Sequence, residues 1–134
     1  MTITLHTYLL VALGGAVGAC LRLGLSDWAN KQWAETFVLG ASLGTLFVNV
    51  IGSLLIGLAY VLIIEKAHLP AEAKPLLMSG LLGALTTFST FSLDTLMHIH
   101  QGQWFHAIGY TFISVICCVL ATFLAVELAR SFYV

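Results

Sequence analysis

Long uninterrupted runs of apolar residues dominate this chain, and only short polar segments separate them. A helix that crosses a bilayer needs about 20 mostly apolar residues. Four runs meet this requirement, and they predict spans over residues 5–25, 39–64, 76–99 and 104–130. The connections between them are too short to hold a separate domain. We therefore expect a single all-α membrane domain of four helices covering residues 1–134.

The composition agrees with lipid as the solvent of this chain. Of its residues 60% are hydrophobic and 8% are charged, whereas soluble domains carry roughly 25% charged residues. Trp28, Trp33 and Trp104 fall near predicted helix ends, where membrane proteins place a belt of aromatic residues. The net charge of −1 provides no basic stripe for nucleic acid, so we expect no nucleic-acid partner.

Lysine and arginine residues are divided almost evenly between the two expected faces of the membrane. Lys66, Lys74 and Arg130 fall on the face that holds both termini, and Arg22 and Lys31 fall on the other. Positive residues normally concentrate in cytoplasmic loops. Their near balance leaves two alternatives open. Either the chain inserts in both orientations and forms antiparallel homodimers, or a weak bias still selects one orientation.

Small residues recur at a spacing that favours close helix packing. Gly14 and Gly18 form a GxxxG pair in the first predicted span, and Gly15 and Ala19 repeat the spacing. Such pairs let two helix backbones approach closely, which drives helix association in lipid. The pattern predicts a tight bundle. It does not distinguish packing within one subunit from packing between subunits.

Polar residues inside the predicted spans require an explanation, because polar groups at membrane depth are costly. Asn49 lies near the middle of the second span. In the third span, Gly80 and Gly83 precede five hydroxyl residues, which are Thr86, Thr87, Ser89, Thr90 and Ser92. Glycines favour a helix break, and the freed carbonyls must then find partners. Exposed carbonyls at such breaks are good ion ligands, so we expect the third helix to be broken and polar.

These groups would suit a small anion. Phe88 and Phe91 are three residues apart and share a helix face, and the edge of an aromatic ring is electropositive. Ring edges, an amide and hydroxyls together offer electropositive hydrogens. Plain helix packing is the alternative, with hydroxyls bonded to their own helix and Asn49 joining two helices. The pattern alone leaves both interpretations open.

Three motifs occur in order along the chain. They are residues 14–22 (GGAVGACLR), residues 44–53 (GTLFVNVIGS) and residues 83–92 (GALTTFSTFS). On these motifs the sequence resembles the Fluc/CrcB fluoride channel family over nearly its whole length. The resemblance implies an antiparallel, dual-topology homodimer with two fluoride pores in the inner membrane of the cell. It also implies a structural sodium ion at the dimer centre, held by the backbone carbonyls of Gly83 and Thr86 from both subunits.

The resemblance further implies which residues line the fluoride pore. These are Asn49, Phe88, Ser89, Thr90, Phe91, Tyr110 and Ser114. Cys118 follows Ser114 by one turn, where relatives offer a hydroxyl, and a thiol is a weaker hydrogen-bond donor. Arg22 and Asp94 are assigned to structure or to the pore entrance.

The function implied by this resemblance is a fluoride-selective channel. It would let cytoplasmic fluoride leave the cell passively, lowering intracellular fluoride and giving resistance. A small multidrug exporter would need an acidic residue in the first span, which has none. A membrane scaffold would leave the hydroxyl-rich break unexplained. Enzyme activity is not expected, because His98 and His100 lie on different helix faces and the other histidines are isolated.

Overall fold

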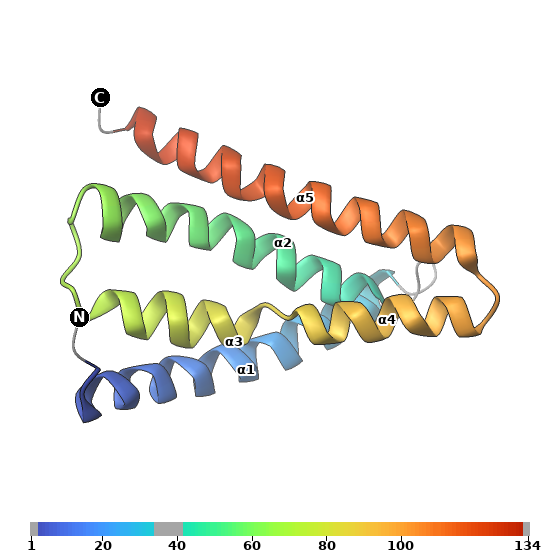
Figure 1. Cartoon of the computed structure of the whole chain (residues 1–134), viewed down its shortest axis with the longest axis horizontal. Helices are drawn as coiled ribbons and strands as arrows, with labels where there is room; N and C mark the ends of the chain where they lie inside the picture. The colour runs from blue at the N-terminus through green and yellow to red at the C-terminus, as the bar shows by residue number, and fades with distance from the viewer. Residues whose placement is uncertain (1–2, 34–41, 133–134) are drawn as a thin grey trace.

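The structure is a computed structural model that describes residues 3–33 and 42–132, and within these ranges all regular structure is helical. Four stretches are long and apolar enough to cross a membrane, which confirms the all-α membrane fold. They run side by side, with both chain termini at the same end of the bundle (Figure 1). The four spans are Leu5–Trp33, Ser42–Glu65, Lys74–His100 and Trp104–Ser131.

Two of the spans are continuous helices and two are divided. The first is α1 (Leu5–Trp33) and the last is α5 (Trp104–Ser131). The second consists of α2 (Ser42–Ala59) and a short π-helix, η1 (Tyr60–Glu65). The third consists of a π-helix and two α-helices, which are η2 (Lys74–Leu82), α3 (Gly83–Leu85) and α4 (Phe88–His100).

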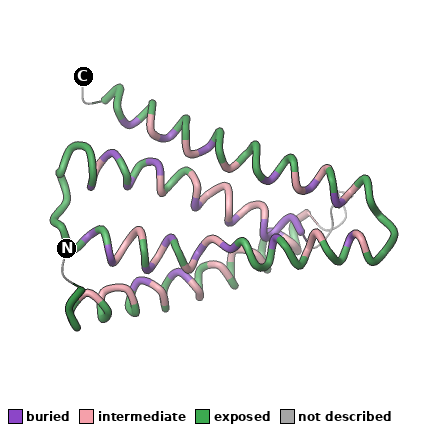
Figure 2. The backbone as a smooth tube through the Cα atoms, in the orientation of Figure 1, coloured by how far each residue is buried: buried purple, intermediate pink, exposed green. Residues whose placement is uncertain are grey.

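Little of each span is buried within the chain itself. Only 11% to 28% of the most apolar stretch of each span is buried. Buried residues follow the inward helix faces, and exposed residues cover the outside (Figure 2). The exposed side chains are largely hydrophobic, among them Leu5, Phe105 and Phe112. Such a surface needs lipid or a second protein surface to cover it.

The first helix is longer than predicted. It continues to Trp33 instead of ending near residue 25, so the prediction of a loop from Ser26 is wrong for residues 26–33. The extension is stabilised locally by an ion pair between Lys31 and Asp27, one turn apart, at 2.6 Å. At 29 residues, α1 is about 43 Å long, which exceeds a hydrocarbon core of about 30 Å.

The added turns of α1 support the start of α2. The Gly44 N–H donates to Asn30 Oδ1 at 2.7 Å, and the Ser26 hydroxyl donates to the Gly44 carbonyl at 3.4 Å. Trp28 and Trp33 both pack against Phe47, with ring centroids 5.7 and 5.3 Å away. The other predicted boundaries agree with the structure within two residues, apart from positions 39–41, which lie outside the described residues.

The third span is broken, as predicted, but the glycines do not form the break. Gly80 and Gly83 are helical, and the chain becomes extended at Thr86 (φ −85°, ψ 154°) and Thr87 (φ −151°, ψ 123°). β-Branched threonine is well suited to extended backbone. The prediction of a glycine break is therefore wrong in its cause.

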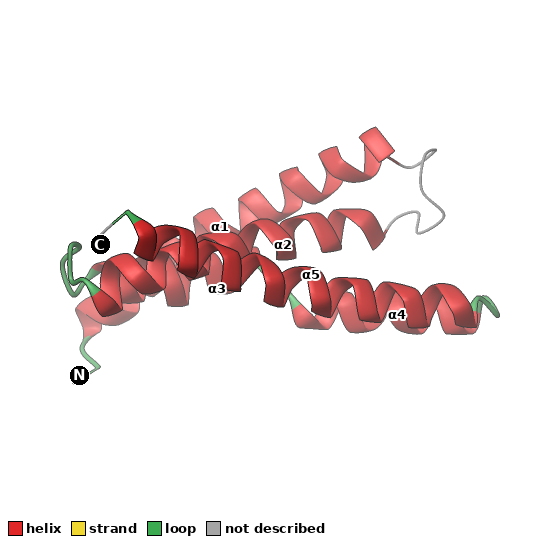
Figure 3. Cartoon of the chain, turned by 90° about the horizontal axis from the view of Figure 1, so that it is seen from above, coloured by secondary structure: helices red, strands yellow, loops and turns green. Residues whose placement is uncertain are grey.

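The break lets the third span exchange one neighbour for another. Before it, η2 and α3 pack against α1, and after it α4 packs against α5. The helix α2 contacts both halves and also packs along α5. Seen from above, α1 and α2 spread away from α4 and α5 toward one end of the molecule (Figure 3).

Glycines bring α1 and η2 into direct backbone contact. A Cβ atom at Gly14 would collide with the Leu76 carbonyl oxygen, and one at Gly18 would collide with the Leu81 carbonyl oxygen. Gly80 faces the same contact from η2, where a Cβ would lie 2.7 Å from the Val11 oxygen. The GxxxG pair of the first span therefore packs within the subunit.

This contact predicts a difference between two neighbouring glycines. Gly18→Ala lowers the free energy of unfolding by about 1–3 kcal/mol, because the added methyl group forces the two backbones apart. Gly15→Ala is the matched control, since a Cβ there meets nothing within 4 Å. Unfolding in detergent micelles by titration with sodium dodecyl sulfate measures both. Equal destabilisation by the two variants would contradict this account of the contact.

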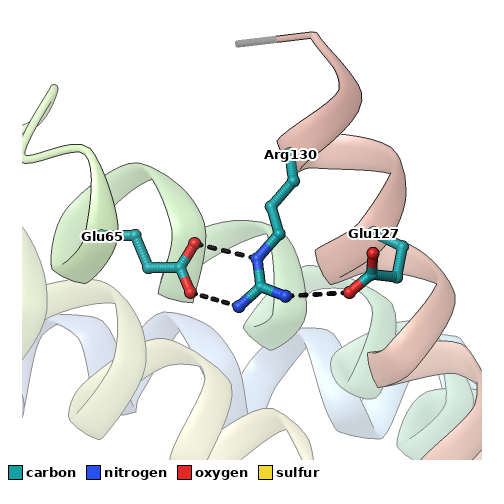
Figure 4. Close-up of polar contacts among 3 residues, drawn as sticks. All are labelled: Glu65, Glu127 and Arg130. Carbon is teal, nitrogen blue, oxygen red and sulfur yellow. Dashed lines mark hydrogen bonds and ion pairs between the residues drawn. The ribbon is translucent and has the colours of Figure 1, made fainter. Parts of the chain in front are cut away.

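An ion-pair cluster joins the ends of two spans at the face that holds the termini (Figure 4). Arg130 Nε donates to Glu65 Oε2 at 3.0 Å, and Arg130 Nη1 donates to Glu127 Oε1 at 2.9 Å. A second guanidinium nitrogen also donates to Glu65. The two-pronged contact holds the end of α5 against η1, and it balances the charge of Arg130 with two carboxylates.

Candidate functional site

Asn49 holds the break in the third span from a neighbouring helix. Its Nδ2 donates to the Thr87 carbonyl at 3.0 Å, and its Oδ1 accepts the Thr87 N–H at 2.8 Å. One amide side chain thus satisfies both polar groups of an extended residue at membrane depth, where lipid offers no hydrogen bonds. The interhelical role considered from the sequence is therefore present, and a second N–H of Asn49 remains outside these bonds.

Thr87 begins α4 as its N-cap residue. Its hydroxyl accepts the Thr90 N–H at 3.2 Å, which satisfies one of the free donors of the first helical turn. The hydroxyls of Ser89 and Thr90 lie 3.1 and 3.2 Å from the same Thr87 oxygen. The structure thus places Ser89 and Thr90 in the cap of α4.

The break removes the helical donors of the carbonyls that precede it, among them those of Gly83 and Thr86. In an unbroken helix the N–H of Thr87 would serve the Gly83 carbonyl, and the N–H of Thr90 would serve the Thr86 carbonyl. Here the first donates to Asn49 and the second to the Thr87 hydroxyl. The two carbonyls that the family resemblance implies as sodium ligands are therefore among the carbonyls at the break that lose their usual donors.

The two phenylalanines after the break differ in their surroundings. Phe91 is only 9% exposed and packs between Phe88 and Tyr110, with ring centroids 5.3 and 5.4 Å away. Phe88 is 78% exposed on the surface of the single chain. Their rings form a short aromatic row that runs from the exterior to the fully buried Tyr110.

A cavity of about 290 Å³ opens beside the break, between α2 and α5. Its walls are mainly apolar, with a few polar side chains set among them. The lining residues are Asn49, Gly52, Ser53, Ile56, Thr86, Thr87, Phe88, Phe91, Ser114, Val115 and Cys118. An apolar cavity with a small number of polar groups is the usual form of a ligand site.

Ser114 is the most unusual polar residue of this cavity. It is 5% exposed, and among the described residues its hydroxyl has no hydrogen-bond partner of good geometry, although the Tyr110 hydroxyl lies near it. A buried polar group without a partner costs about 1–3 kcal/mol. The Ser114 hydroxyl can therefore donate a hydrogen bond to a ligand that enters the cavity.

The remaining residues selected from the sequence lie on α1, α4 and α5. Tyr110 is buried behind Phe91, and its hydroxyl donates to Asp94 Oδ2 at 3.3 Å. Asp94 is partly buried on α4, and Arg22 is partly buried on α1. The cavity thus brings together Asn49, Phe88, Phe91 and Ser114, whereas Ser89, Thr90, Tyr110 and Gly83 lie outside its lining.

A buried hydrogen-bond chain holds the far end of α4. Ser42 Oγ lies 3.0 Å from His98 Nε2, and His98 Nδ1 lies 3.0 Å from Gln103 Oε1. Both ring nitrogens therefore have partners, as a buried imidazole requires. The chain fixes the turn between α4 and α5 against the start of α2, and so holds Tyr110 in place.

Sequence reasoning missed three α2 residues that line the cavity, namely Gly52, Ser53 and Ile56. Gly52 lies where a Cβ would collide with the Thr86 methyl group, so it makes room for the break. Ile56 lines the cavity one helical turn further along. A sequence signal existed for Gly52 and Ser53, which follow Asn49 by three and four residues and therefore share its face.

Comparison with known proteins places this arrangement in a family. The family model described as CrcB-like protein, Camphor Resistance (CrcB), matches residues 9–126. A relative from Aeromonas salmonicida named fluoride-specific ion channel FluC is 41% identical over 127 residues, which is 95% of this chain and 98% of the relative. Relatives of that name from Pseudomonas putida and Magnetococcus marinus are each 44% identical over 120 residues, covering 90% of this chain and 94% of theirs. The chain belongs to the CrcB-like family and is a multi-pass membrane protein.

Proposed function

We propose that this chain forms a fluoride-selective channel in the cytoplasmic membrane. Fluoride would leave the cell passively through it, which lowers intracellular fluoride and gives resistance. The relatives' shared name supports this proposal. The observation that carries it within this molecule is the cavity at the break, where the unpartnered Ser114 hydroxyl shares one space with Asn49 and two aromatic rings.

The cavity has the chemistry to replace water around a small anion. Fluoride is strongly hydrated, so a pore must offer donors as the ion loses its water. Ser114 supplies a free hydroxyl, Asn49 supplies its second N–H, and the edges of Phe88 and Phe91 are electropositive. Among the described residues no carboxylate lines the cavity, so no negatively charged side chain in its lining repels an anion.

Efflux from vesicles tests the proposal directly. Purified protein is reconstituted into liposomes loaded with potassium fluoride, and an electrode follows fluoride release after valinomycin is added. Liposomes loaded with potassium chloride are the selectivity control. Fast fluoride release with slow chloride release supports a fluoride channel, and equal release of both ions would refute the selectivity.

Ser114 provides a prediction in which stability and activity move in opposite directions. Ser114→Ala raises the free energy of unfolding by about 1 kcal/mol, because it removes a buried hydroxyl that has no partner. It slows fluoride release, because one donor of the route is lost. Thermal unfolding in detergent and vesicle efflux measure the two effects. Lower stability in this variant would contradict the unpartnered state of the hydroxyl.

We further propose a structural sodium ion bound by the carbonyls of Gly83 and Thr86. The fit rests on their lost helical donors, which leave oxygen lone pairs at the break. One chain supplies two such oxygens, so the site would be completed by the same two residues of a second copy. A bound cation would supply positive charge that holds these oxygens together. Replacing sodium by N-methylglucamine should then lower the thermal stability, and an unchanged melting temperature would oppose the site.

The partner that we propose is a second, antiparallel copy of this chain. Phe88 is exposed beside the cavity, so a second copy packed there would cover the open side of the cavity. Dual insertion is favoured by the nearly even division of lysine and arginine, three against two, between the two expected faces of the membrane. Cysteine labelling at Glu72 from each side of the membrane tests this. Labelling from one side only would exclude dual topology.

A further inference from the structure

Cys118 occupies a special place among the three cysteines of the chain. It lines the cavity at the break, and it also lines an adjacent cavity of about 410 Å³ together with Ser53, Val119, Thr122 and Phe123. Its thiol is partly buried. Cys118 therefore stands on the wall that the two cavities share.

The residue one turn before Cys118 points independently to a ligand at this place. Ser114 is more than nine-tenths buried, lines the first cavity, and carries a hydroxyl with no partner. Residues four apart on a helix lie on the same face. The thiol and the unpartnered donor are thus presented from one face of α5 to one space.

The other two cysteines provide a contrast within the same chain. Cys20 on α1 and Cys117 on α5 are both exposed, and neither lines either cavity. Cys117 is adjacent to Cys118 in sequence, but successive residues on a helix do not share a face. An adduct at Cys20 or Cys117 would extend away from the cavities, and an adduct at Cys118 would occupy them.

We propose that Cys118 is a modification site inside the conduction route, and that a small thiol-reactive electrophile which adds to its sulfur closes the channel. This inference rests on the proposed function, because it needs a route to close. With an alkyl methanethiosulfonate, the Cys118 thiol loses its proton to the buffer and the thiolate attacks the alkylthio sulfur. A mixed disulfide forms, and methanesulfinate leaves with the electron pair of the broken S–S bond.

The adduct acts through bulk and through polarity. The added methylthio group fits easily in about 290 Å³, yet it places an apolar group next to the Ser114 hydroxyl. A partly dehydrated fluoride ion would then have no space beside the Ser114 hydroxyl, which is its proposed hydrogen-bond donor. Because the modification is a disulfide, a thiol reductant removes it and should reopen the route.

Methyl methanethiosulfonate, applied to reconstituted protein, tests this proposal. The main variant is the double substitution Cys20→Ser with Cys117→Ser, which keeps only Cys118. Cys118→Ser is the reverse control, judged by the ratio of its own fluoride release before and after treatment. Peptide mass mapping locates the adduct, and dithiothreitol tests reversal.

The expected result is an S-methylthio adduct on Cys118, loss of fluoride release in the double variant, and recovery after dithiothreitol. Unchanged release with Cys118 fully modified would overturn the proposal. Absence of any adduct on Cys118 in the folded protein, with full labelling after denaturation, would overturn it as well. Failure of the proposed function would give a different result, namely no fluoride release before the reagent is added. That result would also overturn the proposal that modification of Cys118 closes the channel.

Discussion

Asn49→Leu abolishes fluoride release and destabilises the protein. The substitution keeps the side-chain size but leaves the N–H and carbonyl of Thr87 without their partners at 2.8 and 3.0 Å. Each buried polar group without a partner costs about 1–3 kcal/mol, so the loss of unfolding free energy is roughly 2–6 kcal/mol. Titration with sodium dodecyl sulfate in micelles measures the stability, and vesicle efflux measures the transport.

A matched control separates this effect from the loss of any polar group in a span. Thr111→Val removes a hydroxyl that donates to the carbonyl of its own helix, at Ala107, 2.8 Å away. That carbonyl belongs to an unbroken helix, so we expect little loss of stability and normal fluoride release. Wild-type stability in Asn49→Leu, or equal losses in the two variants, would show that Asn49 does not hold the break.

Phe88→Ile slows fluoride release strongly while the fold remains intact. Phe88 is 78% exposed on the single chain, so little packing within the subunit depends on it. Its ring borders the cavity, and its electropositive edge is lost in isoleucine. If that contact lowers the barrier by about 1.4 kcal/mol, its loss slows passage about tenfold. Initial release rates from vesicles at equal protein density measure the change.

Phe105→Ile is the control for this second prediction. Phe105 is 91% exposed at the start of α5 and does not line the cavity. The Phe105→Ile variant should release fluoride at the wild-type rate, because only loss of the ring beside the cavity is expected to slow release. Phe91→Ile is a less direct test, because Phe91 is buried between two rings and its loss also disturbs packing. Unchanged release by Phe88→Ile would remove the ring edge from the mechanism.

Most of the architecture could be predicted because it follows from local composition. An apolar run long enough to span the hydrocarbon core has no stable alternative to a helix. The predicted end of the first helix, at residue 25, is wrong, because the polar residues 26–33 are typical of a loop. In the structure this segment is held by the Asp27–Lys31 ion pair and by contacts to Gly44 and Phe47 from the next span. Those contacts join two different spans, and the pattern of apolar residues along the chain does not reveal contacts between spans.

The candidate site could be predicted as a set of residues but not as an arrangement. Asn49 and the two phenylalanines stood out because a polar group in lipid and a repeated aromatic spacing are visible in a single sequence. That Phe88 is exposed and Phe91 buried depends on where α5 lies. The unpartnered state of Ser114 depends equally on its neighbours, because a missing hydrogen bond is a property of surroundings.

Four apolar helices, a polar third span and the motifs of a fluoride channel family are all evident from the order of residues along the chain. The position of the break, at Thr86 and Thr87 and not at the glycines, follows from contacts between helices. The physical reason is the partner of Thr87, an asparagine 38 residues away on another helix. A helix can break in lipid only where another group pairs with the backbone N–H and C=O groups that the break frees. Such a partner is in place only after the helices have packed together.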